Sequence, residues 1–361
     1  MKKIVFLLDD LNQIGGIERV VSSIANGLAA HGYKILIINI RGGNSPFFKL
    51  DPSISIKSLF KKHDRIFVKA PLIISRLRHI LAKERPEILI TVEPLLALIS
   101  VPAVIGLPIR NICWEHLNFK VDLGRRARRL ARQIAARFCD DIVTLTEQDK
   151  LFWIHGTNLK AQIHTIPDPC PFPEQINHTT PENSRLVLAV GRITYQKGFD
   201  LLLKAWQKVI TLEPDWRLRI VGSGPDEHYL NQLSSDLGIS KTVEFIPAVV
   251  DVQSHYKEAA IFCMSSRFEG FGVVLLEAMA FGVPVVSFDC ETGPAEILSG
   301  TGAALVPVEN IDALANNLLR LMRDPFLRFR ISQAEKSRVK EFQLDKIVNY
   351  WVNLLERPSK I

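Results

Sequence analysis

The sequence predicts an α/β protein with two doubly wound domains, each built on a parallel sheet that helices cover on both faces. In both halves, apolar runs rich in β-branched residues alternate with helical patterns, and these runs are too uniformly apolar to have a solvated face. Residues 167–183 interrupt the alternation with five prolines and no periodicity, which indicates a domain boundary. The length of 361 residues also favours two domains over one.

The elements of the first half follow one another in this alternating order. Strands are expected at 3–8, 34–40, 87–92, 109–113 and 141–145. Helices are expected between and after them, at 17–30, 65–84, 95–105, 123–138 and 147–155. Gly32 supports the first of these helices, because it stands where a C-cap glycine belongs.

The second half restarts the series after the proline-rich segment. Strands are expected at 185–190, 217–221, 242–246, 260–264, 284–288 and 303–306, with helices between them. We therefore divide the chain into a domain at 1–168, a linker at 169–183, a domain at 184–340 and a terminal helix at 341–361 that crosses back to the first domain. Because ligands of doubly wound sheets bind at the carboxyl ends of the strands, we expect the site in a cleft between the two sheets.

Composition excludes several classes of protein. With 47% hydrophobic and 23% charged residues, each half can bury a core, and long disordered segments are not expected. The five cysteines are scattered and form no C-x-x-C pair, which predicts reduced thiols in a cytosolic protein rather than disulfides or a zinc site. No run approaches the roughly 18 apolar residues of a membrane span.

The net charge of +7 is concentrated in the first half, since residues 1–174 carry +9 and the remainder −2. A basic half suits a phosphate-bearing partner such as nucleic acid, anionic lipid or a diphosphate, although ordinary surface lysines and arginines would produce the same excess. Within this half, the helix "GRRARRLARQIAARF" repeats Leu130, Ile134 and Phe138 every four residues, which predicts an inward stripe with arginines around it. Such a basic amphipathic helix favours an anionic membrane surface, and a solvated arginine face is the alternative.

Several groups with phosphate-binding chemistry follow predicted strands. Arg192 and Lys197 follow strand 185–190, and two cations beside a helix N-terminus can neutralise a diphosphate, although a loop with two surface cations is the alternative. The turn Gly222-x-Gly224 lets backbone approach a nucleotide closely. Glu227 occupies the third glycine position of a dinucleotide fingerprint, which disfavours NAD chemistry, and no P-loop is present. The first strand is followed by an anion-accepting turn at Gly15 and Gly16.

The segment "SRFEGFGVVLLEAMAFG" carries a carboxylate in an unfavourable place. Glu277 lies in a helix that is apolar on every face, so it is expected to be buried and to need a partner. A ribose diol would satisfy Glu277, and the hydroxyls of a second sugar would satisfy Glu269; an internal arginine or backbone amide is the alternative for Glu277. Gly270, Phe271 and Gly272 turn the chain into this helix with free amides at its N-terminus.

Two motifs together resemble the donor site of family 4 glycosyltransferases of the GT-B type: Arg192-x4-Lys197 and Glu269-x7-Glu277. The segment "SFDCETGPAEIL" is similar to that of bacterial members that extend polyprenyl-diphosphate-linked glycans for O-antigen, capsule or N-glycan precursors. The resemblance implies two Rossmann-like domains whose parallel sheets face each other across a cleft. It also implies a retaining, metal-independent hexosyltransferase that needs no cofactor. Such an enzyme moves a hexose or N-acetylhexosamine from a UDP-sugar to a polyprenyl-diphosphate-linked or lipopolysaccharide acceptor, at the cytoplasmic face of the inner membrane.

The resemblance also assigns roles. Arg192 and Lys197 would neutralise the donor diphosphate, Glu277 would bind the ribose, Glu269 the donor sugar, and His116 would lie over the transferred sugar. Further implied donor contacts are Gly16, Gly222, Gly224, Val249, Gly270, Phe271 and Gly272, where Pro247 near Val249 departs from the family's usual glycine. The implied acceptor or membrane residues are Gly15, Gly16, Arg125, Arg128, Arg129 and Arg132.

Three alternatives stay open at this point. A UDP-sugar 2-epimerase shares the two-domain architecture, but both donor motifs argue against it. A GDP-mannose-dependent transferase differs only in donor. A nucleic-acid-binding protein is disfavoured because the arginine run lacks interleaved aromatic residues. The donor sugar, the linkage and the oligomeric state are not predicted.

Overall fold

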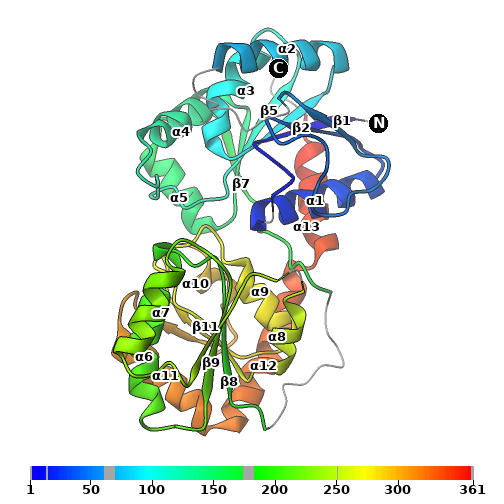
Figure 1. Ribbon diagram of the computed structural model, residues 1–361. Coiled ribbons are helices and arrows are strands. Elements are labelled where there is room, and N and C mark those ends of the chain that lie inside the picture. Colours follow the sequence, from blue (N-terminus) through cyan, green and yellow to red (C-terminus); the bar gives the residue numbers. More distant parts are fainter. Residues whose placement is uncertain (1, 14, 61–69, 174–182, 250, 359–361) are drawn as a thin grey trace. The chain divides into compact units, whose positions relative to one another are not determined.

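A computed structural model of the chain describes residues 2–13, 15–60, 70–173, 183–249 and 251–358. The chain divides into two compact units, one formed by Met1–Pro169 with Leu344–Ile361 and the other by Cys170–Gln343 (Figure 1). Each unit has a parallel sheet with helices on both faces, which confirms the predicted α/β class with two Rossmann-like domains.

The sheet of the first unit has seven parallel strands in the order β3-β2-β1-β4-β5-β6-β7. They are β1 Lys3–Leu8, β2 Lys34–Asn39, β3 Ser55–Ser58, β4 Ile88–Val92, β5 Arg110–Trp114, β6 Asp141–Thr144 and β7 Gln162–Thr165. The helices of this unit are α1 Gly16–Ala30, α2 Ala70–Glu84, η2 Pro94–Leu96, α3 Ala97–Val104, α4 Arg126–Phe138, α5 Glu147–Gly156 and α13 Leu344–Leu355.

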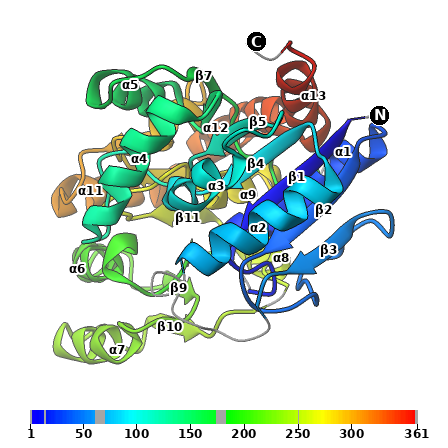
Figure 2. The same cartoon turned by 90° about the horizontal axis from the view of Figure 1, so that it is seen from above.

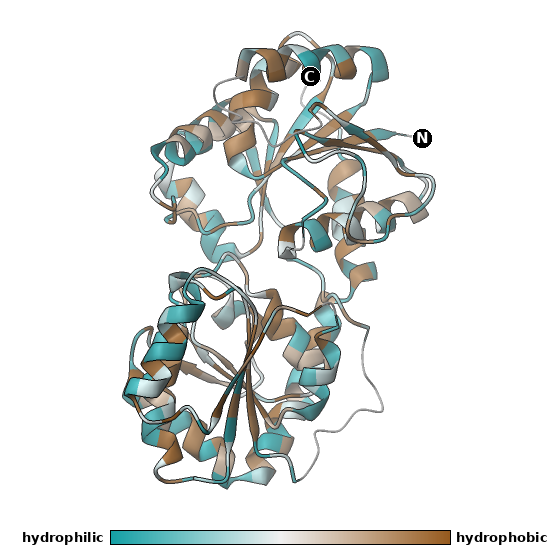
Figure 3. Cartoon of the chain, viewed as in Figure 1, coloured by the Kyte–Doolittle hydropathy of each residue, from teal (hydrophilic) through white to brown (hydrophobic). Residues whose placement is uncertain are grey.

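The alternation of side chains along β5 separates the helices of the first unit into two layers. Cys113 packs in a cluster with Ala135 of α4, whereas the next residue, Trp114, packs against Trp351 of α13. Helices α2, α3 and α4 lie side by side on the first of these faces, and α1 packs with α13 on the other (Figure 2). The strands between them are almost continuously apolar (Figure 3).

The sheet of the second unit has six parallel strands in the order β10-β9-β8-β11-β12-β13. They are β8 Leu186–Val190, β9 Arg217–Val221, β10 Val243–Ile246, β11 Ile261–Met264, β12 Val285–Phe288 and β13 Ala304–Val306. The helices are η3 Tyr195–Lys197, α6 Phe199–Ile210, α7 Glu227–Asp236, α8 Gln253–Glu258, α9 Val273–Ala280, α10 Pro294–Ile297, α11 Ile311–Arg323, α12 Pro325–Val339 and η4 Lys340–Phe342.

The strands that the sequence did not predict are β3 and β7, which form the two edges of the first sheet. Their sequences, SIKS and QIHT, are mixed in polarity and only partly buried, because an edge strand has fewer neighbours to exclude water. The start of the predicted helix at 65–84 and most of the proline-rich segment, 174–182, lie outside the described residues. Of the described helices, none is long and apolar enough to cross a bilayer.

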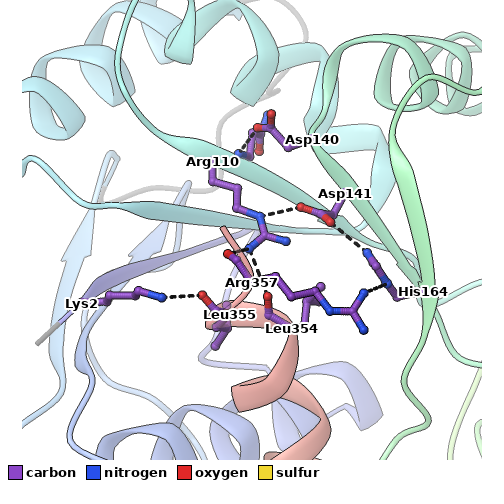
Figure 4. Close-up of polar contacts among 9 residues, drawn as sticks. Lys2, Arg110, Asp140, Asp141, His164, Leu354, Leu355 and Arg357 are labelled. Carbon is purple, nitrogen blue, oxygen red and sulfur yellow. Dashed lines mark hydrogen bonds and ion pairs between the residues drawn. The ribbon is translucent and has the colours of Figure 1, made fainter. Parts of the chain in front are cut away.

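Helix α13 is bound to the first sheet by a buried charge network (Figure 4). Arg110 donates from Nε to Asp141 at 2.7 Å and from Nη1 to the carbonyl oxygens of Leu354 and Arg357, at 3.0 and 3.1 Å. His164 Nε2 lies 2.9 Å from the second oxygen of Asp141. These bonds tie the end of α13 and the residues after it to the sheet, where the Leu354 carbonyl also accepts from the Arg357 N–H at 3.3 Å.

Replacing Arg110 with Met is expected to lower the free energy of unfolding by about 3–5 kcal/mol at pH 7, since it leaves Asp141 buried with part of its compensation removed. Burial alone would raise the pKa of Asp141, but hydrogen bonds from His164 and Arg110 outweigh burial and lower it. The stabilisation is therefore present above the unfolded pKa of about 4 and is lost as the pH falls through the lower folded value.

Urea denaturation at pH 7 and at pH 3 measures this difference. The control is Lys2→Ala, which removes a partly exposed lysine from Leu355 and Glu356 and should cost no more than about 1 kcal/mol. Equal losses in the two variants would contradict the prediction.

Candidate functional site

The residues predicted to bind the donor gather at one edge of the second sheet. Arg192 follows β8, Gly222 and Gly224 follow β9, Val249 follows β10 and residues 269–272 follow β11. Because these four strands are parallel neighbours in the order β10-β9-β8-β11, their carboxyl ends share an edge. The pair β8 and β11 is also the point where the strand order reverses, which is where doubly wound sheets bind ligands.

Lys197 and Glu269 form an ion pair at this edge. Lys197 Nζ donates to Glu269 Oε1 at 2.6 Å, and Gln196 donates to the carbonyl of Phe268 at 3.1 Å. Lys197 ends η3, and Gly198 at φ +61° then begins α6, a left-handed conformation that favours glycine. The lysine neutralises a buried carboxylate and retains two further N–H donors with which to contact a phosphate.

Arg192 is exposed, and its guanidinium has no polar partner within the described parts of the chain. The loop that carries it is held from below by backbone bonds, in which Gly191 donates to Val221 and Ile193 donates to Ser223, both at 3.0 Å. A cation with free donors on a fixed loop can bind an anion without first breaking an internal pair.

Gly222 and Gly224 have a structural reason to be glycine. A Cβ at Gly222 would lie 1.9 Å from the carbonyl oxygen of Gly191, and one at Gly224 would lie 2.0 Å from that of Ile193. The two glycines therefore let the loop after β9 pack against the loop that carries Arg192. Their predicted contact with a nucleotide stays a prediction.

Helix α9 begins as predicted, with Gly272 at φ +99° bending the chain into it. The side chain of Phe271 is buried against Phe342, so the backbone of this turn is the part left for a ligand. Glu277 is buried, and Tyr256 of α8 donates its hydroxyl to Glu277 Oε2 at 2.7 Å. One partner of Glu277 is therefore this tyrosine, which was missed in the sequence, where an arginine or a backbone amide was expected as the internal partner.

Arg267 is a second residue that the sequence analysis missed. It donates to both carboxylate oxygens of Asp200, at 2.8 and 2.7 Å, and to the carbonyl of Tyr195 at 2.8 Å. The bonds to Asp200 are the main reason that the pKa of Arg267 lies above its usual range. The pair joins the loop after β11 to η3 and the start of α6, and so holds Lys197 beside Glu269.

In the first unit, the predicted anion site at Gly15 and Gly16 faces a carboxylate of its own chain. A Cβ on Gly15 would lie 2.2 Å from Glu18 Oε2, so the acid occupies the space over the first turn of α1. Burial is the main cause that raises the pKa of Glu18. A neutral ligand group fits this position better than an anion.

The predicted inward stripe of α4 is wrong for two of its three residues, since only Ile134 packs against the core. Leu130 and Phe138 are 57% and 63% exposed, and the buried face consists of Arg128, Ala131, Arg132, Ala135 and Ala136. Arginine can face inward here because its donors find partners, and the small alanines let the helix approach the sheet.

Arg132 is 2% exposed and is fully engaged inside the unit. Its Nε donates to Glu115 at 2.9 Å, and its other nitrogens donate to the carbonyls of Phe119, Asn118 and Val121. The structure therefore turns Arg132 away from the acceptor role that the resemblance implied. Arg125 and Arg129 are exposed, as that role requires, and Arg129 pairs with Asp122 at 2.8 Å.

His116 is buried beside another acid that the sequence analysis missed. Its Nδ1 lies 4.0 Å from Asp168 Oδ1, and its ring packs on Trp114 with centroids 4.3 Å apart. His116 Nε2 and Asp168 Oδ1 have no hydrogen-bond partner in the ranges described. Burial lowers the pKa of His116 to about 3 and raises the pKa of Asp168 to about 7, so the imidazole is neutral at neutral pH.

Glu93, directly after β4, is the fourth missed residue and has an unusual backbone. Its φ of 75° and ψ of 130° are rare for any residue other than glycine, and it precedes Pro94, which restricts it further. Such a conformation costs on the order of 1–3 kcal/mol and tends to occur at functional sites. The Glu93 side chain is 24% exposed, and Arg128 Nη1 lies 3.5 Å from its Oε2.

Comparison with known proteins relates both units to one family. The model described as Glycosyltransferase Family 4 matches residues 14–170, and that described as Glycosyl transferases group 1 matches residues 173–338. The chain is 35% identical to a protein of Haemophilus influenzae described as an uncharacterized glycosyltransferase, over 98% of this chain and 100% of that protein.

Two further similarities concern characterised proteins. A Campylobacter jejuni protein, 27% identical over 98% of each chain, is named as an α-1,4-N-acetyl-D-galactosaminyltransferase for GalNAc-α-(1→4)-GalNAc-α-(1→3)-diNAcBac-PP-undecaprenol. The crystal structure of Anabaena HepE in complex with UDP and glucose superposes with a TM-score of 0.81 and 18% identity, over 99% of this chain and 100% of that one. This second similarity concerns the fold.

Replacing Asp168 with Asn is expected to change how stability depends on pH. The raised pKa means that the folded protein keeps a proton that the unfolded chain releases, so the wild type loses stability as the pH rises from about 4 to 7. Asn cannot ionise, so the free energy of unfolding of the variant, relative to wild type, should rise by up to about 4 kcal/mol across this pH range. Above pH 7 this difference should stay constant. Urea denaturation at pH 5 and pH 8 measures the gain, with the exposed Asp251→Asn as the control. A gain that does not change with pH would contradict this assignment.

Proposed function

This chain belongs to the family 4 glycosyltransferases, and we propose that it transfers a hexose or N-acetylhexosamine from a UDP-sugar to a polyprenyl-diphosphate-linked saccharide with retention of configuration. The observation that carries the donor half of the proposal is the grouping of Arg192, Lys197 and Glu269 at one edge of the second sheet. UDP is favoured because HepE, which has the same fold, was crystallised with UDP.

In the proposed reaction, the bond between the anomeric carbon and the diphosphate oxygen breaks, and the diphosphate leaves with the electron pair. Arg192 and Lys197 stabilise the charge that develops on it, so no metal ion is needed. The acceptor hydroxyl attacks from the same face, and its proton passes to the departing phosphate oxygen. Glu269, neutralised by Lys197, accepts hydrogen bonds from the donor sugar's hydroxyls. Glu277 and Tyr256 together bind the ribose.

The acceptor half of the proposal is supported by the first unit. The Campylobacter jejuni relative is named for an undecaprenyl-diphosphate-linked acceptor. The outward face of α4, here called the α4 outer face, combines arginines with exposed apolar side chains; it consists of Arg125, Arg126, Arg129, Leu130, Arg137 and Phe138. Such a face suits the surface of an anionic membrane, in which the lipid part of the acceptor resides. We place the enzyme at the cytoplasmic side of that membrane.

The proposal is tested by incubating the protein with UDP-glucose, UDP-galactose, their N-acetylated forms and GDP-mannose, each with a polyprenyl-diphosphate-linked disaccharide and with or without EDTA. Transfer from a UDP-sugar that EDTA does not reduce is expected. Transfer from GDP-mannose alone, activity that EDTA abolishes, or epimerisation of UDP-GlcNAc without acceptor would each contradict it.

Replacing Arg192 with Ala is expected to lower kcat about 100- to 1000-fold, because one cation that stabilises the leaving diphosphate is lost. The matched control is Arg185→Ala, which removes an exposed arginine from just before the opposite end of the same strand. Initial rates and circular dichroism of both variants measure the effect. Equal rates in the two variants would contradict the role of Arg192.

Replacing Arg125 and Arg129 together with Ala is expected to weaken binding to vesicles with anionic phospholipid roughly 30-fold, at about 1 kcal/mol per basic residue near the surface. Flotation measures this binding, and the affinity for UDP should not change. The control is Arg320→Ala, an exposed arginine on α11 of the second unit. Unchanged vesicle binding of the double variant would show that the α4 outer face does not contact the membrane.

A further inference from the structure

Glu93 lies at the switch point of the first sheet. Strands β1 and β4 are neighbours, yet the chain leaves β1 for α1 on one face and β4 for α3 on the other. Doubly wound sheets bind ligands in the crevice beyond the carboxyl ends of two such strands. Glu93 directly follows Val92, the last residue of β4, and so stands at this crevice.

The strained backbone of Glu93 indicates that its side chain has a role other than stabilising the fold. Glycine would adopt a φ of 75° without strain, whereas glutamate before Pro94 does not. The conformation is imposed from both sides, because the Glu93 N–H donates to the carbonyl of Trp114 at 2.9 Å and its carbonyl accepts from Leu96 at 3.1 Å. A fold that required only this turn would be better served by glycine.

The Glu93 carboxylate also has unused hydrogen-bonding capacity. Its nearest cation, Arg128, lies 3.5 Å away, and no hydrogen bond reaches its oxygens from the part of the chain that the structure describes. Arg128 is buried, and its Nε has no partner among the same residues. Other acids of this region are engaged, since Asp9 pairs with Arg41. Glu93 therefore presents an acceptor, and the edge of a largely buried guanidinium lies beside it.

We propose that Glu93 binds hydroxyl groups of the acceptor saccharide, with Arg128 beside it, and so helps to determine which acceptor is used. This inference rests on the proposed function. Sugar hydroxyls can donate to the carboxylate while their oxygens accept from the guanidinium. A diphosphate is disfavoured here, because several carboxylates lie close together. Asp9 interacts with Glu93, and Asp9, Asp10 and Glu93 all interact with Glu18, so a further negative charge would be repelled.

The test compares Glu93→Gln and Glu93→Gly in the full chain, with two acceptors: a polyprenyl-diphosphate-linked disaccharide and the same disaccharide without lipid and diphosphate. We expect the acceptor KM to rise about 10- to 100-fold in both variants, by the same factor for both acceptors, while the KM for the UDP-sugar stays unchanged. Both variants remove the charge beside the buried Arg128, but only Gly relieves the backbone, so the Tm of Glu93→Gly should exceed that of Glu93→Gln.

The control is Glu87→Gln, at the amino end of the same strand, where the Glu87 carboxylate accepts from the Lys3 N–H at 2.7 Å. Its kinetic constants should match those of the wild type. An unchanged acceptor KM in Glu93→Gln, a loss confined to the lipid-diphosphate acceptor, or a Tm of Glu93→Gly below that of Glu93→Gln would each overturn the inference. A wild type that transfers from none of the sugar nucleotides would instead overturn the proposed function, and this inference with it.

Discussion

The proposed donor site depends on the burial of Glu269, a carboxylate that is stable inside the second unit because Lys197 lies 2.6 Å away. The pair joins the loops after β8 and β11, the two strands at which the sheet order reverses. Arg267 and Asp200 hold the same two loops together a few residues away. Arg192 lies on the first of these loops. Because backbone hydrogen bonds fix this loop, Arg192 does not need an ion pair to hold its position, and its side chain is exposed and unpaired among the described residues.

The first unit repeats this arrangement with a looser pair. Its switch point lies between β1 and β4, and there Glu93 and Arg128 approach to 3.5 Å without a hydrogen bond. The tight pair neutralises its buried acid and fixes the two loops, so a ligand can use only the donors and acceptors that the pair leaves free, whereas no hydrogen bond joins the loose pair. In both sheets an acid follows a strand at the switch point, but its cation follows the other switch-point strand in the second unit and lies on α4 in the first.

The local features of the proposed donor site could be predicted because they depend on neighbours in sequence. Arg192 and Lys197 belong to one loop, and Gly272 starts the helix that carries Glu277, so their spacing alone placed them together. The central strands were also predictable, since a strand buried on both faces must be apolar throughout. β3 and β7 escaped prediction because edge strands keep polar residues.

What the sequence determined by itself is therefore the order of the elements, the family and the residues that one loop or one helix brings together. The tertiary structure alone decided which face of α4 turns inward, that Tyr256 reaches Glu277, that Asp168 lies beside His116, and that Glu93 is strained beside Arg128. The physical reason is the same in each case. Periodicity gives the angle of a side chain around its own helix, but the partner of a buried charge comes from another element, and only packing brings the two within reach.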